Sequence, residues 1–418
     1  MTVTAAPNRP SPAKKPGAGH WIRRNLFRTP FDSLLSIVLG SIFLYVVFRA
    51  LMFVFVNARW EIIRVNLKLL LVGRWPADEM FILTVSLVVM ALWGGVIAGR
   101  IAASQLRAGT STTEGMTAVQ RVSDLVRRFG LIIATVLLLL LLTDTSGPWL
   151  TALLMLVASP IGYWLGRVIG VRKLGTWASR IEVLVLIAIP IATFFYMTAA
   201  VPLADWEGFM FNITSAVAGI VLSFPIGVLL ALGRRSKLPL LQSVSIVYIE
   251  FVRGSPLFVL LLLANVSLEF FVPQALAPSK VVRAIVTFTI FSAAYIAEIV
   301  RGGLQSVPRG QEEAAKSVGL SPTKQMFLIV LPQALRNVIP AQIGQFISLF
   351  KDTTLAGVAL GILDLLNGAG AITQQADFRG QGLIIEALVF VAFLFWVGSF
   401  TMSRESQRLE TKLGVGTR

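Results

Sequence analysis

Few residues in this chain could carry out catalysis or bind a metal. The sequence contains no cysteine and one histidine, His20, which excludes disulfides, cysteine-ligated zinc and cysteine nucleophiles. His20 lies in a segment rich in proline and lysine, where we expect a solvated side chain. No Gly-Lys dipeptide occurs, so the chain cannot hold ATP in a Walker A loop. We therefore expect no enzyme, and no metal or cofactor bound by this chain.

The clearest pattern lies in residues 308–332, a polar segment within a sequence that is mostly apolar. Acidic, small and turn-forming residues occur there at fixed spacing. They are Glu313-Ala314-Ala315, then Gly319 after three intervening residues, Ile329 after nine more, and Leu331-Pro332. A polar segment of this kind is suited to contact with another protein.

The same residues predict two short helices joined by a turn. Glu312 and Glu313 fall in a first helical turn, where acidic side chains suit the positive end of the helix dipole. Gly319 is expected to end this helix, because glycine readily adopts the left-handed conformation found at helix C-termini. Ser321-Pro322 then starts a second helix as its cap and first residue.

A small apolar strip is expected on the first of these helices, formed by Ala314, Ala315 and Val318. A helix with an acidic start and a small face could enter the cleft of a partner protein. The alternative is an ordinary amphipathic loop between two membrane spans. We favour the partner-binding interpretation because every position of the spacing is present.

This spacing resembles the EAA motif carried by the membrane subunits of ABC importers. The resemblance implies a cytoplasmic coupling helix that docks on a separate ATPase, with ATP and Mg²⁺ bound by that partner. The residues it assigns to ATPase coupling are Glu312, Glu313, Ala314, Ala315, Gly319, Leu331 and Pro332.

From about Trp206 onward the chain resembles the permease subunits of polar amino-acid ABC importers, of the histidine, glutamate and glutamine type. The matching pieces are residues 250–256, 295–303, 305–311 and 345–355. The N-terminal half, through residues 66–76, resembles the longer subunits of general L-amino-acid systems. These resemblances imply a type I ABC-importer transmembrane fold in the C-terminal half and about five additional N-terminal helices. One departure is Gly344, where many family members carry asparagine.

The resemblance also implies partners and a location. The expected partners are ATP-binding subunits, a second permease subunit (a paralogue in a heterodimer, or a second copy), an extracytoplasmic amino-acid-binding protein, the amino acid itself and membrane lipids. The expected location is the bacterial inner membrane. Two alternatives remain open: an ion-coupled secondary amino-acid transporter, and a scaffold role for the N-terminal half.

Polar residues within the apolar runs are candidates for lining the pathway of an amino acid, because its ammonium and carboxylate groups need charged or amide partners. Alternatively, Glu298 and Asp352 form ion pairs that hold helices together, with Arg253, Arg301 or Lys351 as partners. We favour the ion-pair interpretation for Glu298, and both interpretations stay open for residues 345–354. The candidate substrate- or gate-lining residues are Glu298, Gln345, Lys351, Asp352, Thr353 and Thr354.

The composition predicts a membrane protein. Of 418 residues, 56% are hydrophobic and 14% are charged, with a mean hydropathy of +0.78, whereas soluble domains carry about 25% charged residues. The net charge of +16 comes from bases clustered between apolar runs. This arrangement is typical of cytoplasmic loops near anionic lipid rather than of nucleic-acid binding.

About ten apolar runs are long enough to cross a bilayer as helices, so we predict an all-α polytopic membrane protein. They are residues 31–56, 78–103, 129–146, 148–169, 181–202, 208–233, 242–265, 281–304, 336–360 and 384–403. The charges of the loops place the N-terminus in the cytoplasm. Residues 57–77 are the exception, because an external loop should carry few bases. We interpret this loop as an interfacial helix; its bases are Arg59, Arg64, Lys68 and Arg74.

The expected organisation has four parts: a disordered, basic, cytoplasmic arm at 1–30, a membrane extension at 31–205, a permease core at 206–403 and a cytoplasmic tail at 404–418. Three pairs of glycines spaced four residues apart would permit close approach of helices. These pairs are Gly95–Gly99, Gly162–Gly166 and Gly357–Gly361.

Overall fold

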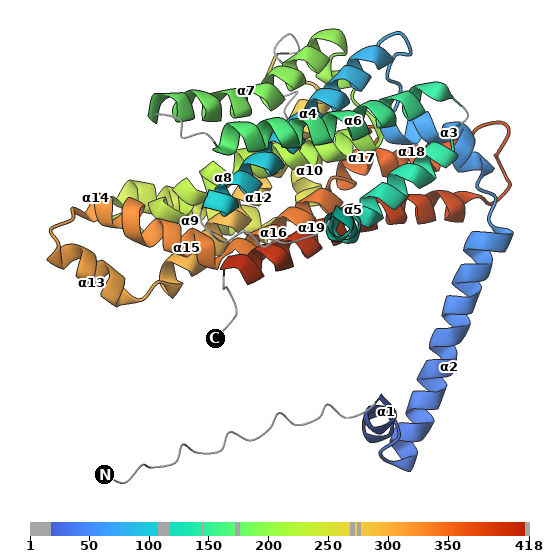
Figure 1. Ribbon diagram of the computed structural model, residues 1–418, viewed down its shortest axis with the longest axis horizontal. Coiled ribbons are helices and arrows are strands. Elements are labelled where there is room, and N and C mark those ends of the chain that lie inside the picture. The colour runs from blue at the N-terminus through green and yellow to red at the C-terminus, as the bar shows by residue number, and fades with distance from the viewer. Residues whose placement is uncertain are drawn as a thin grey trace. The chain divides into compact units, whose positions relative to one another are not determined.

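The computed structural model describes residues 18–107, 118–143, 145–171, 176–267, 272–273 and 277–413. Regular secondary structure within these ranges is helical, which confirms the predicted all-α membrane fold (Figure 1). The chain forms two compact units, which divide between Arg59 and Trp60. Each unit is described by itself.

The first unit contains α1 (Ala18–Leu26) and α2 (Pro30–Met52), which continues as the π-helical turn η1 (Phe53–Asn57). Thr29 caps α2, because its Oγ1 atom accepts a hydrogen bond of 3.0 Å from the backbone N–H three residues further on. The 28 residues Pro30–Asn57 are long and apolar enough to cross a membrane. The arm expected to be disordered over 1–30 is helical in α1, and residues 1–17 lie outside the described residues.

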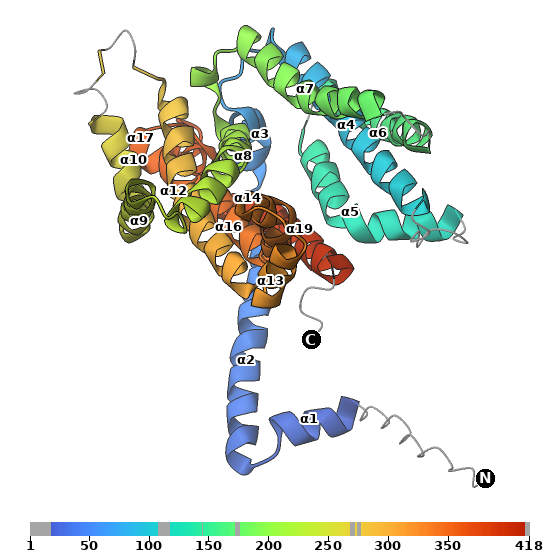
Figure 2. The same ribbon diagram turned by 90° about the vertical axis from the view of Figure 1, so that its left-hand side faces the viewer.

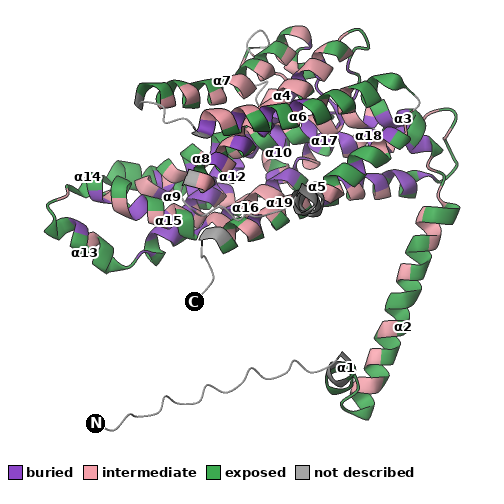
Figure 3. Ribbon diagram, in the orientation of Figure 1, coloured by how far each residue is buried: buried purple, intermediate pink, exposed green. Residues whose placement is uncertain are grey.

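The second unit is built around α8 (Gly208–Arg234) and α12 (Lys280–Ser306), which lie side by side (Figure 2). Gly219 meets Phe288 and Gly227 meets Ile296, so the two helices run in the same direction. The approach is close, since a Cβ atom on Gly227 would lie 2.6 Å from the Cγ2 atom of Ile296. Among the candidate spans in the described chain, α12 has the largest buried share, 61%, which makes it the central helix (Figure 3).

Two predicted spans are bent rather than straight. The run at 242–265 consists of α9 (Pro239–Gly254) and α10 (Leu257–Val266), which meet at 101°. The cause is Pro256, which has no N–H to donate and disfavours a helical conformation at the residue before it.

The run at 336–360 contains two further breaks. The helical run Pro322–Asn337, which ends with α15 (Leu331–Asn337), meets α16 (Ile339–Asp352) at 59°. α16 then ends at Asp352, before a separate short helix, α17 (Leu355–Leu360). The prediction of one span over 336–360 was therefore wrong in both boundaries.

In the part of the chain that the structure describes, fewer helices have the length and composition of a span than the roughly ten predicted. Among the described residues, seven helices are long and apolar enough to cross a membrane, or nine if each bent pair counts as one span. The predicted run at 129–146 corresponds to α5 (Ala118–Leu141), whose apolar part, Gly130–Leu141, is short for a span. The last span, α19 (Ile384–Leu413), continues into the predicted tail, so residues 404–413 are helical.

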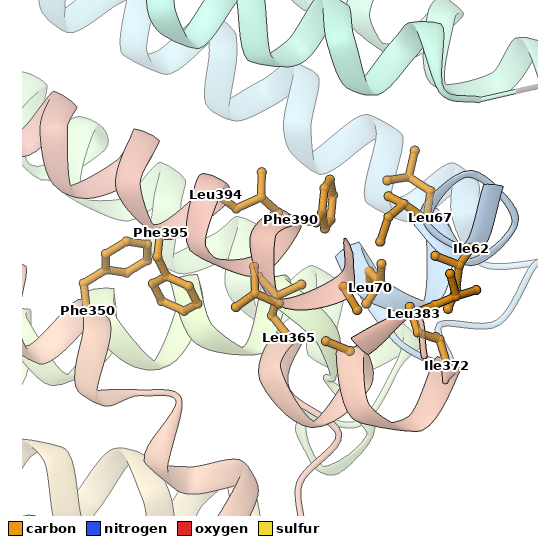
Figure 4. Packing of buried hydrophobic residues seen from close by; sticks show 14 of the residues in the cluster. Ile62, Leu67, Leu70, Phe350, Leu365, Ile372, Leu383, Phe390, Leu394 and Phe395 are labelled. Carbon is orange, nitrogen blue, oxygen red and sulfur yellow. The ribbon is translucent and has the colours of Figure 1, made fainter. Parts of the chain in front are cut away.

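The helix α3 (Glu61–Val72) confirms that residues 57–77 contain a helix, but its apolar side packs on protein. Its apolar side chains, Ile62, Ile63, Leu67 and Leu70, are buried in a cluster with α18 (Leu365–Ile372) and α19 (Figure 4). An interfacial helix would insert this face into the headgroup region of a bilayer. The protein interior takes it up instead, while the bases of α3 stay exposed.

The N-terminal extension confirms two of the three predicted close approaches. Gly95 and Gly99 lie in α4 (Met80–Arg107) and face the backbone of α6 (Ser146–Val171). Gly162 and Gly166 of α6 face the backbone of α4 in return, and no Cβ atom would fit at any of the four positions. The third spacing has another role, because Gly361 ends α17 in the left-handed conformation with φ 67°.

Candidate functional site

The segment 308–332, which we call the EAA segment, lies at one end of the second unit. Figure 1 shows its helices α13 (Arg309–Ser317) and α14 (Pro322–Gln325) at that end, and α3 and α18 at the opposite end. These are called the α13 end and the α18 end below. The helix α8 connects the two, from Gly208 to Arg234.

The turn after α13 has the predicted conformation. Gly319 adopts φ +77°, and the N–H of Leu320 donates a hydrogen bond of 3.1 Å to the carbonyl oxygen of Ala315. This bond satisfies a carbonyl group that the end of the helix would otherwise leave unpaired. The predicted role of Gly319 as helix terminator is confirmed.

The second helix also starts as predicted. Ser321 caps α14, since its Oγ atom accepts a hydrogen bond of 3.4 Å from the N–H of Lys324, and Pro322 is the first helical residue. α14 continues through the π-helical turn η4 (Met326–Val330) into α15. The predicted helix–turn–helix is thereby confirmed.

The EAA segment has two faces, which corrects the predicted apolar strip. Ala315 is buried against the bundle, whereas Ala314 and Val318 are exposed, the latter to 74%. Residues four apart share one face of a helix and their neighbours point elsewhere, so Ala314 and Val318 form the outward face. Glu313 and Pro332 are also exposed, and Leu331 is buried.

Glu312 links the EAA segment to α8. Its Oε1 atom lies 3.7 Å from a terminal guanidinium nitrogen of Arg235, the residue that follows α8. Both side chains are partly exposed, so this ion pair contributes at most about 1 kcal/mol to stability. This ion pair connects α13 to the end of a long helix, α8.

Glu298 lies near the α13 end rather than in the middle of its span, because α12 ends only eight residues later at Ser306. Both carboxylate oxygens accept hydrogen bonds of 3.0 Å from Nε of Arg301. Arg234 of α8 and Arg253 of α9 each approach the same carboxylate to 3.7 Å. Three helices therefore converge on one acid, an arrangement that supports the ion-pair interpretation of Glu298.

The remaining candidates lie on or beside α16 and differ in exposure. Gln345 and Asp352 are partly exposed and Lys351 is exposed. Thr354 is partly buried, and its hydroxyl donates 2.8 Å to the carbonyl oxygen of Lys351. Together with the exposed Ser348, these side chains give α16 a polar, charged stripe that could contact a zwitterionic molecule.

Thr353 does not belong to that stripe. It is fully buried, and its Oγ1 atom accepts a hydrogen bond of 3.1 Å from Nδ2 of Asn212 in α8. The same Nδ2 atom donates 3.2 Å to Oδ2 of Asp364, which caps α18. Sequence reasoning did not find Asn212 or Asp364, because they lie 141 and 152 positions from their partners and no local pattern connects them.

The charge state of Asp364 reflects its burial. Its side chain is fully enclosed, and this burial raises the pKa of the Asp364 carboxyl to about 6, although hydrogen bonds from Asn367 and Asn212 act in the opposite direction. The carboxylate accepts 2.9 Å from the N–H of Asn367.

Comparison with known proteins identifies a family that matches most of the C-terminal half of the chain. Residues 223–414 match the family described as "Binding-protein-dependent transport system inner membrane component". The chain is 41% identical over 224 residues to an inner membrane amino-acid ABC transporter permease protein, YhdY, of Escherichia coli. It is 39% identical over 263 residues to a glutamate/glutamine/aspartate/asparagine transport system permease protein, BztC, of Rhodobacter capsulatus.

Coverage differs among these relatives. The match to YhdY spans 53% of this chain and 60% of the relative. The match to BztC spans 63% of this chain and 59% of the relative. A probable glutamine ABC transporter permease protein of Bacillus subtilis, GlnP, is 35% identical over 209 residues, which span 50% of this chain and 92% of the relative. Among solved structures, an amino acid ABC transporter with histidines matches 52% of this chain and 98% of its own, at 30% identity and a TM-score of 0.45.

Proposed function

We propose, since the chain belongs to the family of inner-membrane permease subunits of amino-acid ABC transporters, that it forms part of the pathway of an ATP-driven amino-acid importer. A separate pair of ATPase subunits, which hold ATP and Mg²⁺, drives it. The chain itself contributes the pathway and the coupling, and no hydrolysis.

The observation that carries this function is the geometry of the EAA segment. A rigid helix, closed by Gly319, presents Glu313, Ala314 and Val318 outward while Ala315 anchors it to the bundle. The small side chain of Ala314 on the outward face allows a partner's backbone to approach closely. A nucleotide-dependent movement of that partner would then be passed from α13 across the Gly319 turn to α14, η4 and α15, and from there to α16. A ligand that binds one of two conformations more tightly shifts the equilibrium between them in this way.

The orientation follows from the same assignment. If the EAA segment faces the cytoplasm, α8 carries the chain to the opposite surface, so α3 and α18 are external. The N-terminus is then cytoplasmic, because α2 precedes α3 as a separate span. An external binding protein would deliver amino acid at the α18 end, and a second permease subunit, paralogous or identical, would complete the pathway.

The substrate class follows from the relatives and from α16. The relatives are named as permeases for amino acids, among them glutamate, glutamine, aspartate and asparagine. On α16, Lys351 can meet a carboxylate, Asp352 an ammonium group, and Gln345 either of them. We propose that this stripe lines the pathway for a polar amino acid.

Reconstitution tests this function. The chain would be purified with its second permease and ATPase subunits, placed in proteoliposomes, and supplied with a binding protein and labelled amino acids. Uptake that requires ATP on the EAA side supports an importer. Uptake that persists without the ATPase and collapses with an ion gradient would instead identify a secondary transporter.

A further inference from the structure

A fully buried polar cluster joins three elements at the α18 end. Asn212 of α8, Thr353 between α16 and α17, and Asp364 at the start of α18 each have no exposed surface. Nδ2 of Asn212 donates to Thr353 and to Asp364, over 3.1 and 3.2 Å. Most buried polar groups in proteins are hydrogen-bonded, because leaving one unpaired in the interior costs about 1–3 kcal/mol.

The orientation of the Asn212 amide is fixed by its surroundings. Its Oδ1 atom accepts 3.1 Å from the backbone N–H of Leu365, so the NH₂ group must face the carboxylate of Asp364. The hydroxyl of Thr353 in turn donates 2.7 Å to the carbonyl oxygen of Phe350, the last turn of α16. Every polar atom of the cluster therefore has a defined partner, and removal of any one of them leaves a buried partner unpaired.

Backbone contacts add to the cluster at the same place. The N–H of Gly208, at the start of α8, donates 2.7 Å to the carbonyl oxygen of Leu363. Gly357 of α17 lies so close to the Asp364 carboxylate that a Cβ atom would collide with it. α8, α17 and α18 are thus held together over a short distance.

The helices at the α13 end are linked differently. Nδ2 of Asn337, on α15, donates a hydrogen bond of 3.0 Å to the hydroxyl of Ser306, on α12, and Nε2 of Gln333, also on α15, donates one of 3.2 Å to Oε1 of Gln311, on α13; both bonds lie in exposed positions. Water can replace such bonds at little cost in free energy, whereas it cannot reach the buried cluster. The last residues of α16 therefore lie beside a buried polar cluster, whereas its first residue, Ile339, follows a 59° break after the helical run Pro322–Asn337, which packs on α12 through apolar side chains.

We propose that Asn212, Thr353 and Asp364 form a fixed joint that holds the α18 end of α16 against α8 while the α13 end moves during transport. Asn212 and Thr353 are positioning residues for the polar stripe of α16 rather than contacts of the substrate. This inference rests on the proposed function, since it assigns to α16 the movement that the ATPase drives.

Uptake by reconstituted variants tests the positioning role. T353V removes the hydroxyl at constant volume and leaves an Asn212 donor unpaired, so the maximal uptake rate per assembled complex should fall about tenfold. The concentration of binding protein at half-maximal rate should not change. T353S keeps the hydroxyl and should restore the rate. T289V is the matched control, because the Thr289 hydroxyl is buried and bonds only to Ile285 of its own helix.

A reciprocal exchange separates positioning from simple loss of stability. N212D places two carboxylates face to face and D364N two amides, and both should abolish uptake. In N212D/D364N the amide introduced at position 364 can donate to the carboxylate introduced at position 212, so uptake should recover at least tenfold over N212D. Equal rates for T353V, T353S and wild type, or no recovery in the exchange while the complex assembles normally, would overturn the joint.

Distances between spin labels test whether the joint stays fixed. The chain contains no cysteine, so labels attach only to introduced ones. I213C and V358C report on the α18 end, and L238C and T323C on the α13 end, all at exposed positions. Trapping of the ATPase in its closed state should change the distance between the labels at positions 238 and 323, and it should leave the distance between the labels at positions 213 and 358 constant. If the 213–358 distance changes as much as the 238–323 distance, the joint is contradicted. Failure of the wild-type complex to take up amino acid with ATP would instead contradict the proposed function.

Discussion

At the residue scale, three residues show how much of the site can be predicted from the sequence. Gly319 could be predicted as a helix terminator, because the left-handed conformation favours glycine and the turn chemistry is local. Thr353 could be singled out as polar and near α16, but not as buried. Asp364 could not be found at all, because its environment is made by Asn212, 152 positions away.

The φ of +77° at Gly319 leads to a test of the turn. G319V should weaken the end of α13 by about 1 kcal/mol or more, because β-branched residues rarely adopt positive φ. No atom lies within 4 Å of a Cβ built at Gly319. The loss of stability would therefore come from the strained backbone conformation and not from a steric clash. G319N tolerates this conformation and should retain ATP-driven uptake, whereas G319V should lose uptake with normal membrane insertion. G310A is the control, since Gly310 lies within α13 and also has open space. Uptake by G319V at the wild-type rate would argue against a rigid turn.

The buried carboxylate of Asp364 leads to a pH dependence of stability. Its pKa is about 6 in the folded protein, above the ordinary value of 3.8, so the folded state binds the proton more tightly than the unfolded state. Stability should therefore fall as the pH rises from about 4 to 6, by on the order of 2–3 kcal/mol from this group. Thermal unfolding of the purified protein would show this slope, and D364N should lack it. An identical slope in wild type and D364N would exclude Asp364 as its source.

At the element scale, the sequence predicted helices well and their continuity poorly. The run at 242–265 is apolar throughout, yet Ser255-Pro256 divides it, and a composition window does not register a single proline. α3 was placed at a lipid surface because its bases alternate with apolar residues. Only the positions of α18 and α19 show that its apolar face is covered by protein. Patterns of neighbouring residues therefore predict that a segment is helical. Contacts with distant helices decide whether its apolar face meets protein or lipid.

The close approach of α4 and α6 can be tested with adjacent glycines. G95L should separate the two helices, because a Cβ atom at Gly95 collides with the backbone at Ser159. G94L is the matched control, since nothing lies within 4 Å of a Cβ at Gly94. We expect less folded protein in detergent for G95L, measured by size-exclusion chromatography, and a normal yield for G94L. Equal yields would show that the extension does not depend on this contact.

At the scale of the whole molecule, the second unit has a different character at each end. The α13 end presents a small, outward helix face and ion pairs that water can reach. The α18 end carries a buried polar cluster and the covered helix α3. In an importer, the α13 end would suit a surface that a partner binds and moves. The α18 end would suit the part of the unit that stays fixed.

The most direct test is thiol labelling of V318C, on the outward face of α13, with a reagent that does not cross membranes. The chain has no other cysteine, and V65C, at an exposed position of α3, marks the opposite end. We expect V318C to react only in inside-out vesicles and to be protected when the ATPase subunits bind, while V65C reacts only in right-side-out vesicles. Labelling of V318C from the outside, or no protection by the bound ATPase, would contradict the assignment of the EAA segment as the cytoplasmic coupling site.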